Sequence, residues 1–134
     1  MITKEYYNLG KIEILSKDVI IERNKNPNVP IEYRQWSKLT FDEAEQIAEE
    51  MGNGWRIPTM EELFFLQQYN DLKLLNFDTK EAYWSSKGLE SDITDTGYYG
   101  ISSETSAWVY YFGSKRRGGI PKTERIRARL VRSV

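Results

Sequence analysis

The chain has 134 residues, of which 40% are hydrophobic and 13% aromatic, with 19 basic and 20 acidic side chains. This length fits one domain that can bury a core without disulfides or metals, and the apolar content excludes a disordered chain. The net charge of −1 gives no general attraction to nucleic acid or to an acidic membrane. Because the sequence has neither cysteine nor histidine, a thiol nucleophile is excluded, and the most common metal ligand and general base is missing.

The N-terminal sequence MITKEYYNLGKIEIL lacks the apolar segment of a secretory signal, and no apolar run is long enough to span a bilayer. We therefore expect a cytoplasmic protein that does not associate with membranes. An export signal upstream of the given sequence would change this expectation to a secreted or surface-associated protein.

Two short segments near the N-terminus, residues 11–15 and 18–23, are rich in Ile and Val and are separated by a polar pair. This pattern predicts a β-hairpin. Residues 24–30, with two prolines and three asparagines, predict a turn. Trp36 follows, and its size suggests an anchor beneath the next helix.

The first helix is predicted over residues 40–51, because its capping and its apolar pattern agree. Thr40 is a suitable N-cap, and Glu43 stands at the position that completes a capping box. One apolar stripe is formed at helical spacing by Ala44, Ile47, Ala48 and Met51.

The stretch GNGWRIPTMEELFFL, residues 52–66, ends one helix and begins another. Gly52 and Gly54 can take the positive φ that terminates a helix. Thr59 and Glu62 predict a second capping box, followed by a helix over residues 60–69. Its broad apolar face consists of Leu63, Phe64, Phe65 and Leu66.

Strand-like segments dominate the second half of the chain. Residues 82–87 and 107–112 are rich in aromatic residues, and residues 125–131 alternate Arg with Ile, Ala and Leu. Two apolar helices need a sheet to cover, so we predict an α+β fold with a small, mainly antiparallel, twisted sheet. Residues 88–106 form a long loop between two strands, and loops of this length are more often functional than idle.

Four motifs occur in an order that resembles a bacterial domain family. They are the helix end and start at residues 52–63, Tyr-Trp-Ser-Ser at 83–86, the aromatic strand from Ala107, and the arginine-rich segment 127–132. The family is named after the C-terminal domain of a collagen-like adhesin (Lcl-type), and it is similar to formylglycine-generating enzymes and to the variable ligand-binding proteins of diversity-generating retroelements.

The resemblance implies a C-type-lectin-like fold for residues 36–134, within a single domain over residues 1–134. Residues 1–35 depart from the family pattern, so their hairpin and turn are predicted from the residues only. The resemblance also implies that the ligand-binding face includes the long loop.

The enzymatic relatives of this family need cysteines or histidine ligands, and the sequence contains none. We therefore predict a protein without catalysis, without a cofactor and without a metal. Asn26-Pro27-Asn28 resembles a lectin calcium motif only superficially and is better explained as a turn. Asp92 and Asp95 are possible calcium ligands, but no dense run of acidic residues surrounds them, and we do not predict a site there.

The long loop has the composition of an antibody paratope. Tyrosines supply rigid contact area, and serines and glycines supply adaptable hydrogen bonds. We predict that a protein or glycan ligand is bound by Tyr98, Tyr99, Ser102 and Ser103. The alternative is that these tyrosines fold back on the core.

The C-terminal part of the chain is strongly basic. Its arginine row can pair with the acidic helices, which is the favoured interpretation. The alternative is that Lys115, Arg116 and Arg117, on a glycine-containing turn, bind an anionic polymer, with Tyr110 stacking nearby. Nucleic acid is a disfavoured partner because the net charge is close to zero.

Two functions of other classes stay open at this stage. The protein could be a structural subunit of a phage or cell-surface assembly, which predicts a homo-oligomer. It could also be a glycosidase that uses two carboxylates, which requires that two acidic side chains converge in a cleft.

Overall fold

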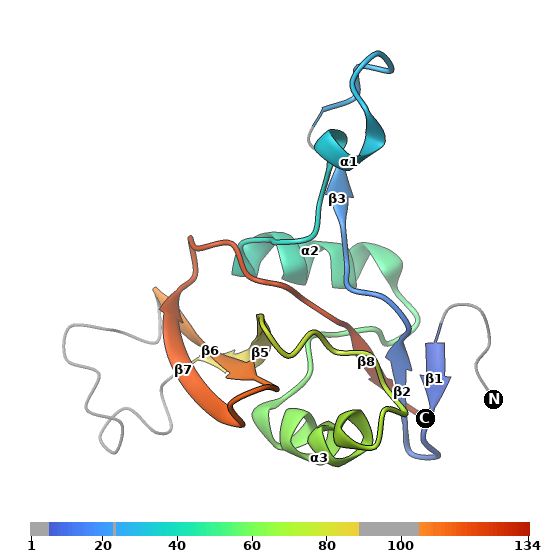
Figure 1. Ribbon diagram of the computed structural model, residues 1–134, viewed down its shortest axis with the longest axis vertical. Helices are drawn as coiled ribbons and strands as arrows, with labels where there is room; N and C mark the ends of the chain where they lie inside the picture. The colour runs from blue at the N-terminus through green and yellow to red at the C-terminus, as the bar shows by residue number, and fades with distance from the viewer. Residues whose placement is uncertain (1–5, 23, 89–104) are drawn as a thin grey trace.

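The computed structural model describes residues 6–22, 24–88 and 105–134 (Figure 1). Helices and strands alternate irregularly along these parts of the chain. The strands are β1 (Tyr6–Asn8), β2 (Ile12–Leu15), β3 (Ile21–Glu22), β4 (Gln35–Trp36), β5 (Ala82–Gly88), β6 (Ser106–Tyr111), β7 (Arg116–Pro121) and β8 (Val131–Ser133). The helices are α1 (Ile31–Arg34), α2 (Phe41–Met51) and α3 (Met60–Asp71).

The strands form three antiparallel sheets, with the orders β1-β2-β8, β3-β4 and β5-β6-β7. The predicted hairpin between residues 11–15 and 18–23 is wrong. After β2 the chain continues beside the C-terminal segment, where the amides of Leu15 and Val19 donate to the carbonyls of Leu130 and Ala128 at 3.0 and 2.8 Å. In a hairpin, the amides of Leu15 and Val19 would bond within residues 11–23 and not to the C-terminal segment.

The two longer helices cover opposite faces of the strands, because neighbouring side chains in a strand point to opposite sides. In β5, Ala82 and Trp84 face α2, whereas Tyr83 faces α3. Figure 1 shows α2 and α3 on the two sides of the strand layer. The core is therefore divided into two apolar clusters, one under each helix.

Both predicted capping boxes are confirmed. Thr40 accepts from the amide of Glu43, and Thr59 accepts from the amide of Glu62, while each glutamate bonds back to the amide of its threonine. Gly52 and Gly54 have φ angles of 62° and 82°, in the left-handed region that glycine favours.

The broad apolar face predicted for α3 is only half correct. Leu63 and Leu66 are fully buried, but Phe64 and Phe65 are 47% and 43% exposed.

The C-terminal segment joins the sheets to one another. Predicted as one strand over residues 125–131, it forms isolated bridges from Ile126 to Leu39 and from Arg127 to Tyr83, and becomes a regular strand only in β8. The predicted alternation holds, because Ala128 and Leu130 are buried among the residues under α2.

Candidate functional site

The residues predicted to bind a ligand are only partly covered by the described parts of the chain. Tyr98, Tyr99, Ser102 and Ser103 lie outside the described residues, as do Asp92 and Asp95. The strands before and after this segment are paired, with Gly88 opposite Ala107, so the segment starts and ends at the same end of the β5-β6-β7 sheet.

Lys115 and its two neighbours lie at the opposite end of that sheet, because Tyr111 pairs with Arg116. The length of β6 separates the two ends by about 17 Å at 3.3 Å per residue. The sequence predicted a turn for this basic stretch, but the turn ends at Lys115, and Arg116 and Arg117 begin the edge strand β7.

The three cations also point to different partners. The Lys115 ammonium lies 3.3 Å from a carboxylate oxygen of Asp71, and the Arg117 guanidinium lies 4.6 Å from the centre of the Trp108 ring. Arg116 is exposed and forms no ion pair with any residue in the described parts of the chain. The three cationic side chains therefore do not point toward one common position.

Tyr110 was predicted to stack against a ligand, and this prediction is wrong. Its side chain is 1% exposed and packs edge-on against Phe64 and Phe112 under α3. The hydroxyl donates to Oε1 of Gln67 at 2.7 Å, which satisfies it inside the core. Burial raises the pKa of this tyrosine above its usual value.

The arginine row is neutralised within the fold, since Arg125, Arg127, Arg129 and Arg132 all form ion pairs with carboxylates. Only one partner, Glu43, lies on a helix. The other close partners, Asp18 and Glu13, lie on the N-terminal segment beside the arginines. The prediction of acidic helices as the main partners is therefore wrong, because most of these carboxylates lie in β2 and in the connection that follows it.

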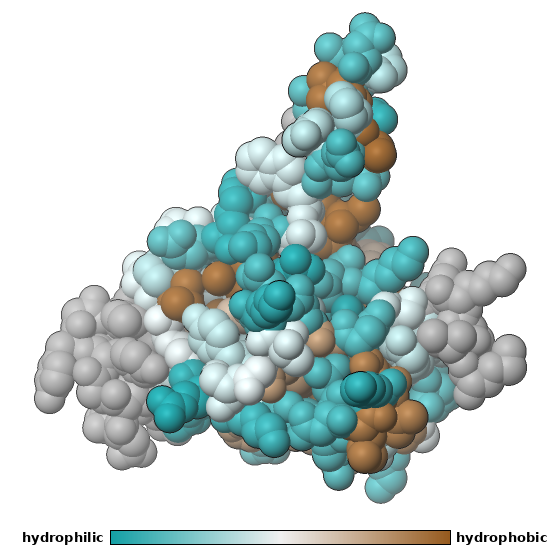
Figure 2. All heavy atoms as spheres, viewed as in Figure 1, coloured by the Kyte–Doolittle hydropathy of each residue, from teal (hydrophilic) through white to brown (hydrophobic). Residues whose placement is uncertain are grey.

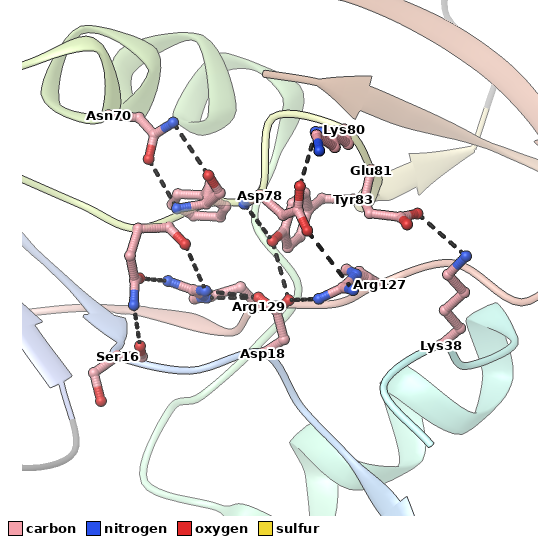
Figure 3. Close-up of polar contacts among 12 residues, drawn as sticks. Ser16, Asp18, Lys38, Asn70, Asp78, Lys80, Glu81, Tyr83, Arg127 and Arg129 are labelled. Carbon is pink, nitrogen blue, oxygen red and sulfur yellow. Dashed lines mark hydrogen bonds and ion pairs between the residues drawn. The ribbon is translucent and has the colours of Figure 1, made fainter. Parts of the chain in front are cut away.

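Asp18 is the centre of the largest polar cluster in the described residues (Figure 3). One of its oxygens accepts from Nε and Nη2 of Arg129 at 3.0 and 2.7 Å. The other accepts from Nη1 of Arg127 at 2.8 Å and from the hydroxyl of Tyr83 at 3.0 Å. Arg129 also donates to Asn76.

This cluster is structural rather than catalytic. Both oxygens of Asp18 are already bonded by two donors each, so neither is available to a substrate. Burial, with the Asp18 charge beside it, raises the pKa of Tyr83 far above its usual value, so the hydroxyl stays neutral. The cluster holds the connection after β2 against the C-terminal segment.

A projecting arm is formed by residues 20–22 and 24–36. Figure 1 shows β3, α1 and β4 standing away from the body of the molecule, and Figure 2 shows apolar residues along the arm. Its large apolar side chains are open to solvent: Ile20 (49%), Ile31 (50%), Tyr33 (67%) and Trp36 (42%). Trp36 is thus not the buried anchor that its size suggested.

The base of the arm, at Trp36, and the residue that follows the long loop, Thr105, both lie near the start of α2. Arg125 pairs with Glu43 at 2.7 Å and lies 5.2 Å from the Trp36 ring centre. Nearby, the amide of Lys122 donates to the carbonyl of Thr105, where the chain returns from the loop. We call the arm, residues 105–106 and residues 121–125 the α2 end of the molecule.

A shallow hollow lies beside this end, between α2 and the strand β5. It has a volume of about 290 Å³ and is lined by Glu45, Ala48, Glu49, Trp55, Arg56, Ile57 and Ser86. Burial, followed by the charge of Asp42, raises the pKa of Glu45. In the described parts of the chain, no three acidic side chains lie close enough together to hold a metal ion.

The fold can be compared with solved structures. The chain is similar over 100% of its length and 100% of theirs to botrocetin, with a TM-score of 0.57 and 10% identity, and to botrocetin in a complex with a mutant A1 domain of von Willebrand factor, with a TM-score of 0.55 and 9% identity. The chain has a C-type-lectin-like fold. At these identities the similarity establishes the fold only.

No protein-family model and no curated protein matches the sequence. The C-type-lectin-like architecture expected from the four motifs is therefore supported, whereas the specific resemblance to the collagen-like adhesin family is not. In the described ranges, no helix is long and apolar enough to cross a membrane.

Sequence reasoning missed the arm as a candidate site. Of its aromatic residues only Trp36 was considered, and it was expected to be an anchor beneath the next helix because of its size. The available signal was the short spacing between the turn at residues 26–29 and the next helix, which leaves Ile31 and Tyr33 no element to pack against.

Proposed function

We propose that the chain is a non-catalytic recognition module whose ligand is another protein, bound at the α2 end. The observation that supports this function is the exposure of large apolar side chains on the arm, led by Tyr33 at 67%. Isolated exposed apolar residues are common, but a cluster on one projecting element marks an interaction surface. Tyr and Trp also provide much of the binding energy in protein interfaces.

The long loop belongs to the same proposal. Tyr98, Tyr99, Ser102 and Ser103 have a paratope-like composition. The strand that follows the loop begins beside Lys122, which lies 5.1 Å from the ring centre of Phe41 at the start of α2. A protein ligand that contacts the base of the arm therefore also lies close to Thr105, where the chain returns from the loop.

The test is a binding screen of the purified protein on protein and glycan arrays at two salt concentrations. We expect a protein ligand whose binding survives added salt, because apolar contacts are not screened as charges are. A double variant, Ile31→Ser with Tyr33→Ser, should weaken this binding at least tenfold, as should Tyr98→Ala with Tyr99→Ala. Arg116→Ser is the matched control and should leave binding unchanged.

Three outcomes would overturn the proposal. Binding to glycans only would assign a lectin function to the loop. Binding that collapses with salt and is lost in Arg116→Ser would assign an anionic polymer as the ligand. A large drop in melting temperature in the arm variant would show that Ile31 and Tyr33 stabilise the fold and are not a free surface.

A further inference from the structure

A second exposed apolar surface lies on α3, on the other side of the strand layer from α2. Its large apolar side chains are Phe64 (47%), Phe65 (43%), Leu72 (69%) and Leu74 (57%). Figure 2 shows apolar residues where α3 ends in Figure 1. The solvent side of a surface helix is normally polar, whereas no element among the described residues covers this apolar face.

The residues on this face follow one line along the helix. Glu61, Phe65, Gln68 and Leu72 are all exposed and occur at positions i, i+4, i+7 and i+11, which share one side of an α-helix. We call this line, with Phe64 and Leu74 beside it, the α3 stripe. It has different features at its two ends.

At its N-terminal end the stripe borders a groove of about 380 Å³. Phe65 and Ile12 form its apolar walls, and Thr59, Glu61, Glu62 and Lys11 complete the lining. At the C-terminal end the stripe protrudes, because Leu72 and Leu74 are the most exposed of its apolar residues. Groove and protrusion are about 16 Å apart, which is the rise of a helix from residue 61 to residue 72.

The charges at the two ends are also opposite. Glu61 stands beside the groove, and Lys73 lies between the two protruding leucines. Neither forms an ion pair with a residue in the part of the chain that the structure describes. The helix face thus carries the carboxylate of Glu61 at one end and the ammonium of Lys73 beside its other end, while Lys11 adds an ammonium to the groove lining.

We propose that the α3 stripe binds a second copy of this chain, as a two-fold symmetric dimer with antiparallel helices. In that arrangement Leu72 and Leu74 of each copy enter the groove of the other, and each Lys73 faces the other copy's Glu61. A two-fold interface requires a surface that is complementary to itself after rotation, and this surface meets that requirement in shape and in charge. A parallel arrangement would oppose like charges.

The dimer leaves the α2 end free on both copies, because α2 and α3 lie on opposite faces of the strand layer. Each dimer would then present two recognition surfaces, which raises the avidity for a repetitive ligand. The dimer stands independently of the proposed function, since monomeric protein could still bind through the arm.

The first test is sedimentation of the full chain over a range of concentrations. We expect a monomer–dimer equilibrium that Leu72→Ser with Leu74→Ser shifts to monomer. Glu61→Lys or Lys73→Asp should each weaken the dimer about tenfold by opposing like charges, and the two together should restore it. Asp is chosen at position 73 because Lys73 has a φ of 61°, which Asp tolerates.

The second test uses the absence of cysteine from the sequence. Gln68 lies midway along the stripe, so Gln68→Cys places the single thiols of the two copies next to the symmetry axis, where oxidation should link them rapidly. Gln46→Cys, on the exposed side of α2, is the matched control and should link slowly. A wild-type protein that stays monomeric at every accessible concentration would overturn the proposal. So would a dimer in which the charge exchange gives no rescue, or in which both thiols link equally fast.

Discussion

Arg129 is 3% exposed, and its guanidinium donates two hydrogen bonds to a single oxygen of Asp18. Asp18→Ala would leave this buried cation, and Arg127 beside it, without their close carboxylate. Removing one partner of a buried ion pair costs about 3–5 kcal/mol of unfolding free energy. Urea denaturation should show a loss of that size.

The control for this prediction is an exposed pair. Glu81 lies 3.2 Å from Lys38, with side chains 31% and 49% exposed, and Glu81→Gln should cost less than about 1 kcal/mol. Equal losses in the two variants would mean that solvent, and not Asp18, neutralises Arg129.

The lowered pKa of Glu62 predicts how the stability of the protein changes with pH. Burial acts to raise the pKa of Glu62, but hydrogen bonds from Arg56 and from the Thr59 amide outweigh burial and hold the pKa below its usual value. A carboxylate with a depressed folded-state pKa stabilises the protein above its unfolded-state value of about 4.3, and this contribution is lost as the pH falls through the folded-state pKa. Glu62→Gln keeps a capping side chain but removes the charge.

We therefore expect Glu62→Gln to be about 1 kcal/mol less stable than the wild type at neutral pH and to lose less stability on acidification. Chemical denaturation at a series of pH values below neutral measures both effects. Glu49→Gln, on the exposed side of α2, serves as control and should keep the wild-type acid profile. A Glu62→Gln profile parallel to that of the wild type would contradict the assignment.

Ser85 is fully buried, and its hydroxyl has no hydrogen-bond partner among the described residues. A buried unsatisfied hydroxyl costs about 1–3 kcal/mol. Ser85→Ala should consequently be neutral or more stable than the wild type in thermal unfolding. A clear loss of stability would show that the hydroxyl is satisfied by water or by a residue outside the described ranges.

Gly113 lies against the backbone of Thr79, so a Cβ at this position would overlap the Thr79 carbonyl oxygen. Gly113→Ala should therefore move the turn after β6 and destabilise the protein by about 1–3 kcal/mol. Gly118→Ala is the matched control, because its Cβ would meet Tyr111 and Val109 at ordinary distances of 3.6 and 3.8 Å. If both variants unfold at the same temperature, the turn is not confined by Thr79.

The local signals in the sequence predicted local structure well. Thr40 and Thr59 begin the two main helices, and Gly52 ends the first, because caps and positive φ angles depend on a few neighbouring residues. The strands at residues 82–87 and 107–112 also formed where their aromatic composition indicated, as β5 and β6.

Pairing over long sequence distances could not be predicted in the same way. The segment after β2 carries the residues of a hairpin strand, but Asp18 pairs with arginines that follow it by about 110 positions. The prediction for Tyr110 was wrong for a related reason, since Tyr110 and the exposed residues Phe64 and Phe65 have similar side chains and differ only in what packs over them. A single sequence contains no information on that choice.

The position of β8 has a consequence for how the chain folds. β8 supplies one edge of the β1-β2-β8 sheet, and its Arg132 reaches across 119 positions to Glu13. During synthesis β2 therefore has an open edge until β8 has left the ribosome. Pairing between strands that are far apart in the sequence slows folding, and until it forms, the unpaired strand edge can bind other chains. We expect the nascent protein to depend on protection of this edge, and a chain that stops before β8 to aggregate instead of folding.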